Sequence, residues 1–145
     1  MISITKIFRF EAAHAIYSYP GACANMHGHS YELHVSIRAK QEEHGYIDRL
    51  GIIFDFKDLK KLVVGAVNQL DHKVILSKAY LKNSPQQFTK EELTLFDYEP
   101  TAENLLIFFH DRIKIELPET ISLVHLKLWE TKDSYAEWTC DWIWV

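Results

Sequence analysis

Residues 27–39 read His-Gly-His-Ser-Tyr-Glu-Leu-His-Val-Ser-Ile-Arg-Ala, and this stretch decides the fold. From Tyr31 onward every odd position is apolar and every even position is polar. A period of two is typical of a β-strand that turns one face to a core and the other to solvent. His27 and His29 also occupy odd positions, so we expect both imidazoles on the core side of this strand.

Three other stretches alternate in the same way and predict further strands. Between Ile2 and His14 the apolar residues fall mostly at even positions, and His14 ends that apolar stripe. Ile121–Glu130 and Ala136–Val145 alternate near the other end of the chain. The apolar side chains expected on one face of Ile121–Glu130 are Val124, Leu126 and Leu128.

The spacing of apolar residues changes to that of a helix in two places. Asp55 is expected to cap a helix whose apolar residues recur at helical spacing from Leu59 to Leu70. Thr101 is expected to cap a second helix, which Pro118 ends. We therefore predict two amphipathic helices in the middle of the chain.

Two segments are less regular. Ile52–Phe54 is expected to form a short strand-like piece, and residues 72–99 a long, partly helical connection. The order of predicted elements is β-β-α-α-β-β. Strand hairpins that flank a pair of helices favour an α+β fold, in which an antiparallel sheet carries both helices on one face. The length of 145 residues suits a single domain, residues 1–145.

Composition and charge exclude several classes of protein. With 16 Lys and Arg against 20 Asp and Glu, the net charge of −4 does not favour a nucleic-acid binder. The longest apolar run, Leu105–Phe109, is far shorter than the roughly 20 residues that cross a bilayer. Two cysteines, Cys23 and Cys140, are too few for a disulfide framework. We therefore expect a soluble, cytoplasmic chain with no nucleic-acid or membrane partner.

Three histidines are expected to meet at one end of the sheet. If the first two strands are antiparallel neighbours, His14 at the end of the first lies beside His27 and His29 at the start of the second. Three neutral imidazoles on rigid strands match a catalytic zinc site, which leaves one position open for water or substrate. Iron and copper also accept imidazole ligands, and the alternative to a metal site is that these are ordinary core or surface histidines.

Cys23 and the pair Asp71-His72 are candidates for proton transfer. Cys23 lies four residues before His27, where a nearby metal cation would favour its thiolate as a base or nucleophile; the alternative is an inert apolar residue. His72 follows the first predicted helix, and Asp71 can orient it as an acid–base group. Alternatively, His72 only bonds the last carbonyl groups of that helix.

Glu130 is the most informative carboxylate in the sequence. It falls on the same face as Leu126 and Leu128, where an isolated buried carboxylate would be costly, so it should be paired or bind a ligand. Alternatively, the strand has ended and Glu130 is solvated. Glu103 lies in the first turn of the second predicted helix, where a negative charge is favourable.

Together these segments resemble the 6-pyruvoyltetrahydropterin synthase / 6-carboxytetrahydropterin synthase family over most of the chain. No single motif is decisive, but six occur in the family's order. They are Phe10–His14, Cys23–His29, Ile53–Leu59, Leu70–His72, Pro100–Asn104 and Glu130–Thr131.

The resemblance implies a fold, an assembly and a set of site residues. The fold is the tunnelling fold (T-fold), and the assembly is a homohexamer, a dimer of trimers, with active sites at subunit interfaces. The implied zinc ligands are His14, His27 and His29. The other implied site residues are Cys23 as the catalytic cysteine, Asp71 and His72 as its relay, Glu130 as the pterin anchor, and Thr101 and Glu103 in substrate binding.

The resemblance also implies a reaction. The cysteine four residues before His27 is similar to the bacterial carboxytetrahydropterin type, whereas the pyruvoyl enzymes usually have a longer gap. The implied reaction converts 7,8-dihydroneopterin triphosphate to 6-carboxy-5,6,7,8-tetrahydropterin, acetaldehyde and triphosphate, on the route to queuosine and related 7-deazapurines. The alternatives are a 6-pyruvoyltetrahydropterin synthase, which eliminates triphosphate without cleaving the side chain, and a non-catalytic zinc- and pterin-binding protein.

Overall fold

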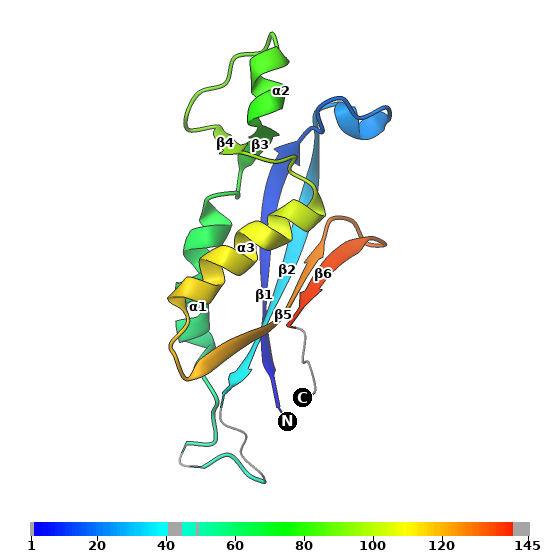
Figure 1. Ribbon diagram of the computed structural model, residues 1–145. Coiled ribbons are helices and arrows are strands. Elements are labelled where there is room, and N and C mark those ends of the chain that lie inside the picture. Colours follow the sequence, from blue (N-terminus) through cyan, green and yellow to red (C-terminus); the bar gives the residue numbers. More distant parts are fainter. Residues whose placement is uncertain (1, 41–44, 49, 141–145) are drawn as a thin grey trace.

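The computed structural model describes residues 2–40, 45–48 and 50–140, and its core is one six-stranded sheet (Figure 1). The strand order across the sheet is β4-β3-β1-β2-β5-β6. The strands are β1 Ile4–His14, β2 His27–Ala39, β3 Lys73–Ser77, β4 Leu93–Phe96, β5 Ile121–Trp129 and β6 Tyr135–Thr139. The helices are α1 Phe56–Asn68, α2 Lys78–Asn83 and α3 Ala102–Glu116, with a short 3₁₀ turn, η1, at Ala22–Ala24.

Strand β2 lies at the centre of the antiparallel part of the sheet, as its alternation predicts. It pairs with β1 over the whole length of β1, and this register places His14 opposite His27. Its odd apolar side chains are almost completely buried: Tyr31, Leu33, Val35 and Ile37. The sheet therefore has one core face and one outer face, and the histidines at positions 27 and 29 lie on the core face.

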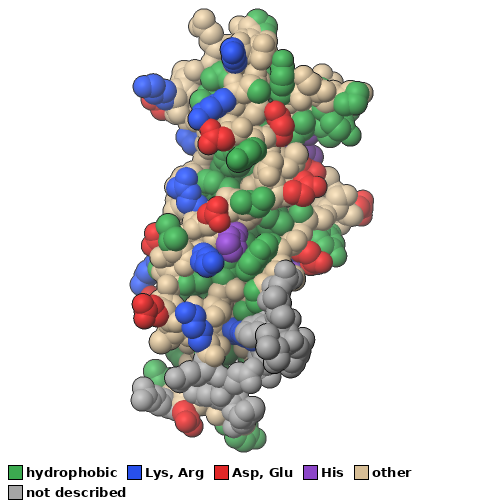
Figure 2. All heavy atoms as spheres, viewed as in Figure 1, with side chains coloured by type: hydrophobic (Ala, Val, Ile, Leu, Met, Phe, Trp, Pro, Cys, Tyr) green, Lys and Arg blue, Asp and Glu red, His purple; other side chains and the backbone are tan. Residues whose placement is uncertain are grey.

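Helices α1 and α3 cover the core face of the sheet (Figure 1), so the predicted α+β architecture is confirmed. Asp55 caps α1 by accepting a hydrogen bond from the Lys57 N–H, and Thr101 caps α3 by accepting one from the Asn104 N–H. Figure 2 shows positively and negatively charged side chains interspersed over this helical face. No helix within the described residues is long and apolar enough to span a membrane.

The irregular regions differ from the sequence-based prediction. Ile52–Phe54 does not form a strand. The segment 72–99 contains two strands, β3 and β4, in addition to the expected helical turn, which is α2. Strand β3 pairs parallel with β1 and with β4, so the sheet is mixed rather than wholly antiparallel. The run Ile75-Leu76-Ser77 is buried throughout, and a strand buried on both faces shows no alternation.

A β-bulge in β5 changes which residues of that strand face the core. Ser36 pairs with His125 but Ile37 pairs with Leu123, so Val124 is an extra residue on β5. Leu123 is consequently buried and Val124 only half-buried, which corrects the predicted face at that position. Beyond the bulge Leu126 and Leu128 are buried as predicted.

Strand β6 is shorter than the predicted stretch Ala136–Val145. It ends at Thr139, and residues 141–145 lie outside the described part of the chain. Ala136 and Trp138, which share one face of the strand, pack against the core.

Candidate metal centre and active site

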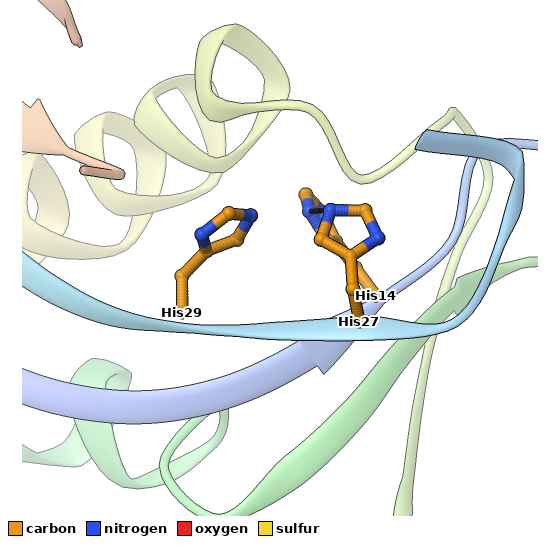
Figure 3. Close-up of side chains that lie close together, drawn as sticks. All are labelled: His14, His27 and His29. Carbon is orange, nitrogen blue, oxygen red and sulfur yellow. Dashed lines mark hydrogen bonds between the residues drawn. The ribbon is translucent and has the colours of Figure 1, made fainter. Parts of the chain in front are cut away.

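The three predicted histidines converge at one end of the β1–β2 pair. One ring nitrogen from each of His14, His27 and His29 lies within 4.8 Å of the others, and His14 is buried. Figure 3 shows the three rings on the same side of the strands, with His29 displaced along β2 and turned toward the other two. The convergence expected from strand parity and antiparallel pairing is confirmed.

Backbone carbonyls determine the tautomers of two of these histidines. His14 Nδ1 lies 2.6 Å from the Pro100 carbonyl oxygen, and His27 Nδ1 lies 2.7 Å from the Asn25 carbonyl oxygen. A carbonyl oxygen only accepts hydrogen bonds, so each Nδ1 carries the proton and each neutral ring keeps an unprotonated Nε2. The two Nε2 atoms are 3.0 Å apart and present lone pairs to each other.

This arrangement fits a metal cation. Two nitrogen ligands about 2.0–2.1 Å from a tetrahedral zinc lie roughly 3.3–3.4 Å apart, close to the Nε2 separation of His14 and His27. The Nε2 of the third histidine, His29, is buried and has no hydrogen-bond partner among the described residues. A metal ion bound here would give this nitrogen a partner. Hydrogen bonds from a ligating histidine to a carbonyl through its other nitrogen are a regular feature of metal sites.

The carboxylate of Glu130 lies beside the histidine cluster. Its Oε1 is 3.5 Å from His14 Nε2 and 3.6 Å from His29 Nε2. The strand ends at Trp129, and the Glu130 N–H donates to the Ser134 carbonyl in the turn that follows. Glu130 is therefore beyond the strand, yet its carboxylate points to the imidazoles and is not free in solvent.

Tyr31 is a neighbour of the cluster that sequence reasoning did not single out. Its hydroxyl lies 3.5 Å from His14 Nδ1, and its ring packs edge-on against His29. Burial, and secondarily the negative charge of Glu130, raise the pKa of Tyr31 far above its usual value, so the phenol stays protonated. Tyr31 lies two residues after His29, so the alternation of the strand places both on the same face. Tyrosine is common at core positions, so the sequence alone gives no reason to connect it with the site.

Asp71 and His72 form a bonded pair. Asp71 Oδ1 lies 2.9 Å from His72 Nδ1 and accepts a second hydrogen bond from the Glu11 N–H. The His72 N–H donates to the Glu11 carbonyl, and His72 has a φ of +58°, which is strained for a residue other than glycine. The backbone of β1 therefore fixes this pair, and the carboxylate orients an exposed imidazole in the manner of an acid–base relay.

An open hollow of about 410 Å³ lies beside His72. Its lining includes His72, Glu11, Ser30 and His29. Gly28 also lines it, and a Cβ there would lie 3.4 Å from the Ala12 carbonyl oxygen. The missing side chain at Gly28 keeps the surface beside His72 open.

Three other predicted site residues are not joined to the cluster in the described part of the chain. Cys23 is an exposed free cysteine in η1, and its carbonyl accepts a hydrogen bond from the Ile16 N–H. No described hydrogen bond or ion pair joins it to Asp71 or His72. The Thr101 hydroxyl serves as the α3 cap, and Glu103 is exposed in the first turn of α3.

Burial lowers the pKa of two of the clustered imidazoles. Desolvation is the main cause for both His14 and His29, and the positive charge that His27 carries when protonated lowers both further. The Pro100 hydrogen bond and the charge of Glu130 oppose this effect at His14. The neutral, metal-binding form is therefore favoured at neutral pH.

We expect the metal-free protein to lose stability as the pH falls below the ordinary histidine pKa of 6.5. In the unfolded chain His14 and His29 bind protons near that pH, whereas in the folded protein they bind them only at lower pH, so protonation favours unfolding. Urea unfolding between pH 7.5 and 5.5 measures this effect. A His14→Gln variant should show a smaller loss over the same range, and an unchanged loss would contradict the assignment.

The sequence of this chain matches a protein family model and several curated enzymes over most of its length. The model of the family described as 6-pyruvoyl tetrahydropterin synthase matches residues 3–140. A 6-carboxy-5,6,7,8-tetrahydropterin synthase of Haemophilus influenzae is 30% identical, with 95% of this chain and 99% of the relative covered. The enzyme of the same name from Aquifex aeolicus is 29% identical, with 93% and 96% covered.

Solved structures show the same fold. The 6-pyruvoyl tetrahydropterin synthase of Caenorhabditis elegans superposes with a TM-score of 0.70 at 21% identity, covering 97% of this chain and 96% of that one. An uncharacterized protein from Wolinella succinogenes superposes with a TM-score of 0.76 at 16% identity, covering 97% and 98%. At these identities the likeness supports the predicted T-fold.

Proposed function

Because the chain belongs to the 6-pyruvoyl tetrahydropterin synthase family, we propose that it is a zinc-dependent 6-carboxy-5,6,7,8-tetrahydropterin synthase. In the proposed reaction, 7,8-dihydroneopterin triphosphate and water give 6-carboxytetrahydropterin, acetaldehyde and triphosphate. The names of the relatives that are about 30% identical favour this branch. The proposal includes a place in queuosine biosynthesis and a cytoplasmic location.

The observation that carries the proposal is the cluster of His14, His27 and His29 with the carboxylate of Glu130 beside it. Three imidazole ligands leave a coordination position open, as in catalytic zinc sites. When bound, zinc would act as a Lewis acid that binds the side-chain hydroxyl groups of the substrate and makes them more acidic. Glu130 is the group that can accept two parallel hydrogen bonds, from the 2-amino group and the ring N–H of a pterin.

Proton transfer is assigned to Cys23 and to the Asp71-His72 pair. The Asp71 carboxylate holds the His72 imidazole by its Nδ1, which leaves Nε2 to take up or deliver a proton. The exposed thiol of Cys23 is the second proton carrier, acting on the ring and side-chain carbons of the substrate. Thr101 and Glu103, at the start of α3, stay assigned to substrate binding.

We also propose a homohexamer, built as a dimer of trimers, with active sites at the subunit interfaces. A proton relay needs its members within about 2.6–3.2 Å of each other or joined by one water. Within one protomer, no hydrogen bond between described residues joins Cys23 to the Asp71-His72 pair. A symmetric neighbour that brings its own Asp71 and His72 to Cys23 would complete the relay.

Product identification tests the proposal. We expect zinc-loaded protein, incubated anaerobically with 7,8-dihydroneopterin triphosphate, to release 6-carboxytetrahydropterin and acetaldehyde, detected by mass spectrometry. A Cys23→Ala variant should bind zinc normally and lose at least about 100-fold in rate, because proton transfer by a positioned group contributes that much.

Two other outcomes would contradict the proposed reaction. Pyruvoyltetrahydropterin would assign the protein to the other branch of the family. Zinc binding without either product would indicate a different substrate or a non-catalytic zinc- and pterin-binding protein.

A further inference from the structure

Glu99 lies between β4 and α3 and uses both oxygens of its half-buried carboxylate. Oε1 accepts a hydrogen bond from the Ser77 hydroxyl at 2.8 Å, and Oε2 accepts one from the Tyr17 N–H at 2.9 Å. Ser77 is 1% exposed at the end of β3, and Tyr17 lies three residues beyond the end of β1. One carboxylate therefore ties together the ends of two neighbouring strands.

The backbone of Glu99 is held as firmly as its side chain. Its carbonyl accepts hydrogen bonds from the Thr101 N–H at 2.9 Å and from Asn104 Nδ2 at 2.8 Å. The next residue, Pro100, is buried, and its carbonyl accepts the 2.6 Å hydrogen bond from His14 Nδ1. The position of this carbonyl, and with it the orientation of the His14 ring, depends on where Glu99 is anchored.

The two anchoring bonds are charge-assisted, because an ionised carboxylate accepts them from a hydroxyl and a backbone amide. The hydrogen bond from Tyr17 joins the segment before α3 to the residues that follow β1. Strand β1 ends at His14. Loss of the carboxylate would leave the nearly buried Ser77 hydroxyl and the Tyr17 amide without this partner. The segment that carries the Pro100 carbonyl would then be held only from the α3 side, by the bonds from Thr101 and Asn104 to the Glu99 carbonyl.

We propose that Glu99 is a positioning residue for the metal centre, which acts by holding the Pro100 carbonyl against His14 Nδ1. Its described hydrogen bonds go to Ser77, Tyr17, Thr101 and Asn104 and to none of the three histidines. Groups that orient a ligating histidine through its second nitrogen typically change metal affinity by 10–100-fold. The inference rests on the three-histidine metal site and holds whichever pterin is the substrate.

Zinc affinity of the full-length protein, measured by competition with a chromophoric chelator, tests this role. For Glu99→Ala we expect the zinc dissociation constant to rise about 10-fold or more. Glu99→Gln should rescue most of the affinity, because its amide oxygen can accept from the Tyr17 N–H and its amide nitrogen can donate to the Ser77 hydroxyl. Asp97→Asn is the matched control, since Asp97 pairs only with the exposed Lys78 in the described interactions, and its zinc affinity should equal that of the wild type.

If Glu99 only stabilises the fold, its variants should change stability and not zinc affinity. If Glu99→Ala lowers the unfolding midpoint of the metal-free protein but leaves the zinc dissociation constant unchanged in the folded state, the proposal is overturned. If that variant does not fold, Glu99→Asp decides, because its carboxylate is one methylene shorter and cannot hold both partners. Wild-type zinc affinity in Glu99→Asp would then overturn the proposal. The readout needs no substrate, so it is independent of the product assay.

Discussion

A His29→Ala variant is expected to bind zinc at least about 100-fold more weakly than the wild-type chain and to lose turnover with it. Zinc sites gain roughly 10–16 kcal/mol from a full ligand set, so one imidazole contributes several kcal/mol of binding free energy. The Nε2 of His29 is buried and has no hydrogen-bond partner among the described residues, and only the Glu130 carboxylate, at 3.6 Å, forms a described ion pair with it. Two remaining histidines cannot make a three-ligand site.

The measurement is zinc stoichiometry and affinity after dialysis, by chelator competition. His125→Ala is the matched control, because His125 lies on β5 and pairs with the carboxylate of Glu137 at 3.0 Å, away from the cluster. That control should retain one zinc per chain with wild-type affinity. Equal zinc affinity in His29→Ala and the wild type would show that the cluster is not the metal site.

Most of this site follows from the sequence because strand parity and antiparallel pairing are local rules. The alternation from Tyr31 places His27 and His29 on the core face, and an antiparallel partner that ends at His14 completes the cluster. The Glu130 carboxylate lies beside the imidazoles, as one of the two readings expected, although the strand has ended at Trp129, as the other expected. The bulge at Val124 breaks the parity of β5 upstream. Parity counted from the buried Leu126 and Leu128 gives the side of the sheet on which Glu130 is found, one residue past the end of the strand.

Other features depend on contacts that no local pattern reports. Strands β3 and β4 pair in parallel with distant partners, and burial on both faces removes the alternation that reveals a strand. The carbonyl of Pro100 becomes a partner of His14 only through the packing of α3 against the sheet. Likewise, the bond between Asp71 and His72 depends on the left-handed conformation of His72, which a histidine adopts rarely.

The relay between Cys23 and His72 is expected to work between subunits. Cys23→Ala and His72→Ala should each lose at least about 100-fold in turnover while they keep zinc, because neither residue belongs to the three-histidine cluster. Subunits of the two variants, exchanged by co-refolding or co-expression, should recover activity. If each site takes its cysteine from one subunit and its histidine from a neighbour, random mixing leaves about a quarter of the sites with both residues intact.

Recovery to roughly a quarter of the wild-type rate would require a site shared between chains, because neither variant contains both groups. A relay within one protomer predicts no recovery, since every chain then lacks one of its own two residues. Native mass spectrometry of the mixed sample establishes that subunits have exchanged, so an inactive mixture of true hetero-oligomers would rule out the shared site. Mixing Cys23→Ala with the Cys23→Ala/His72→Ala double variant is the control, because no interface in that mixture carries an intact cysteine. The exposure of both Cys23 and His72 in the single chain is what a relay assembled between chains requires.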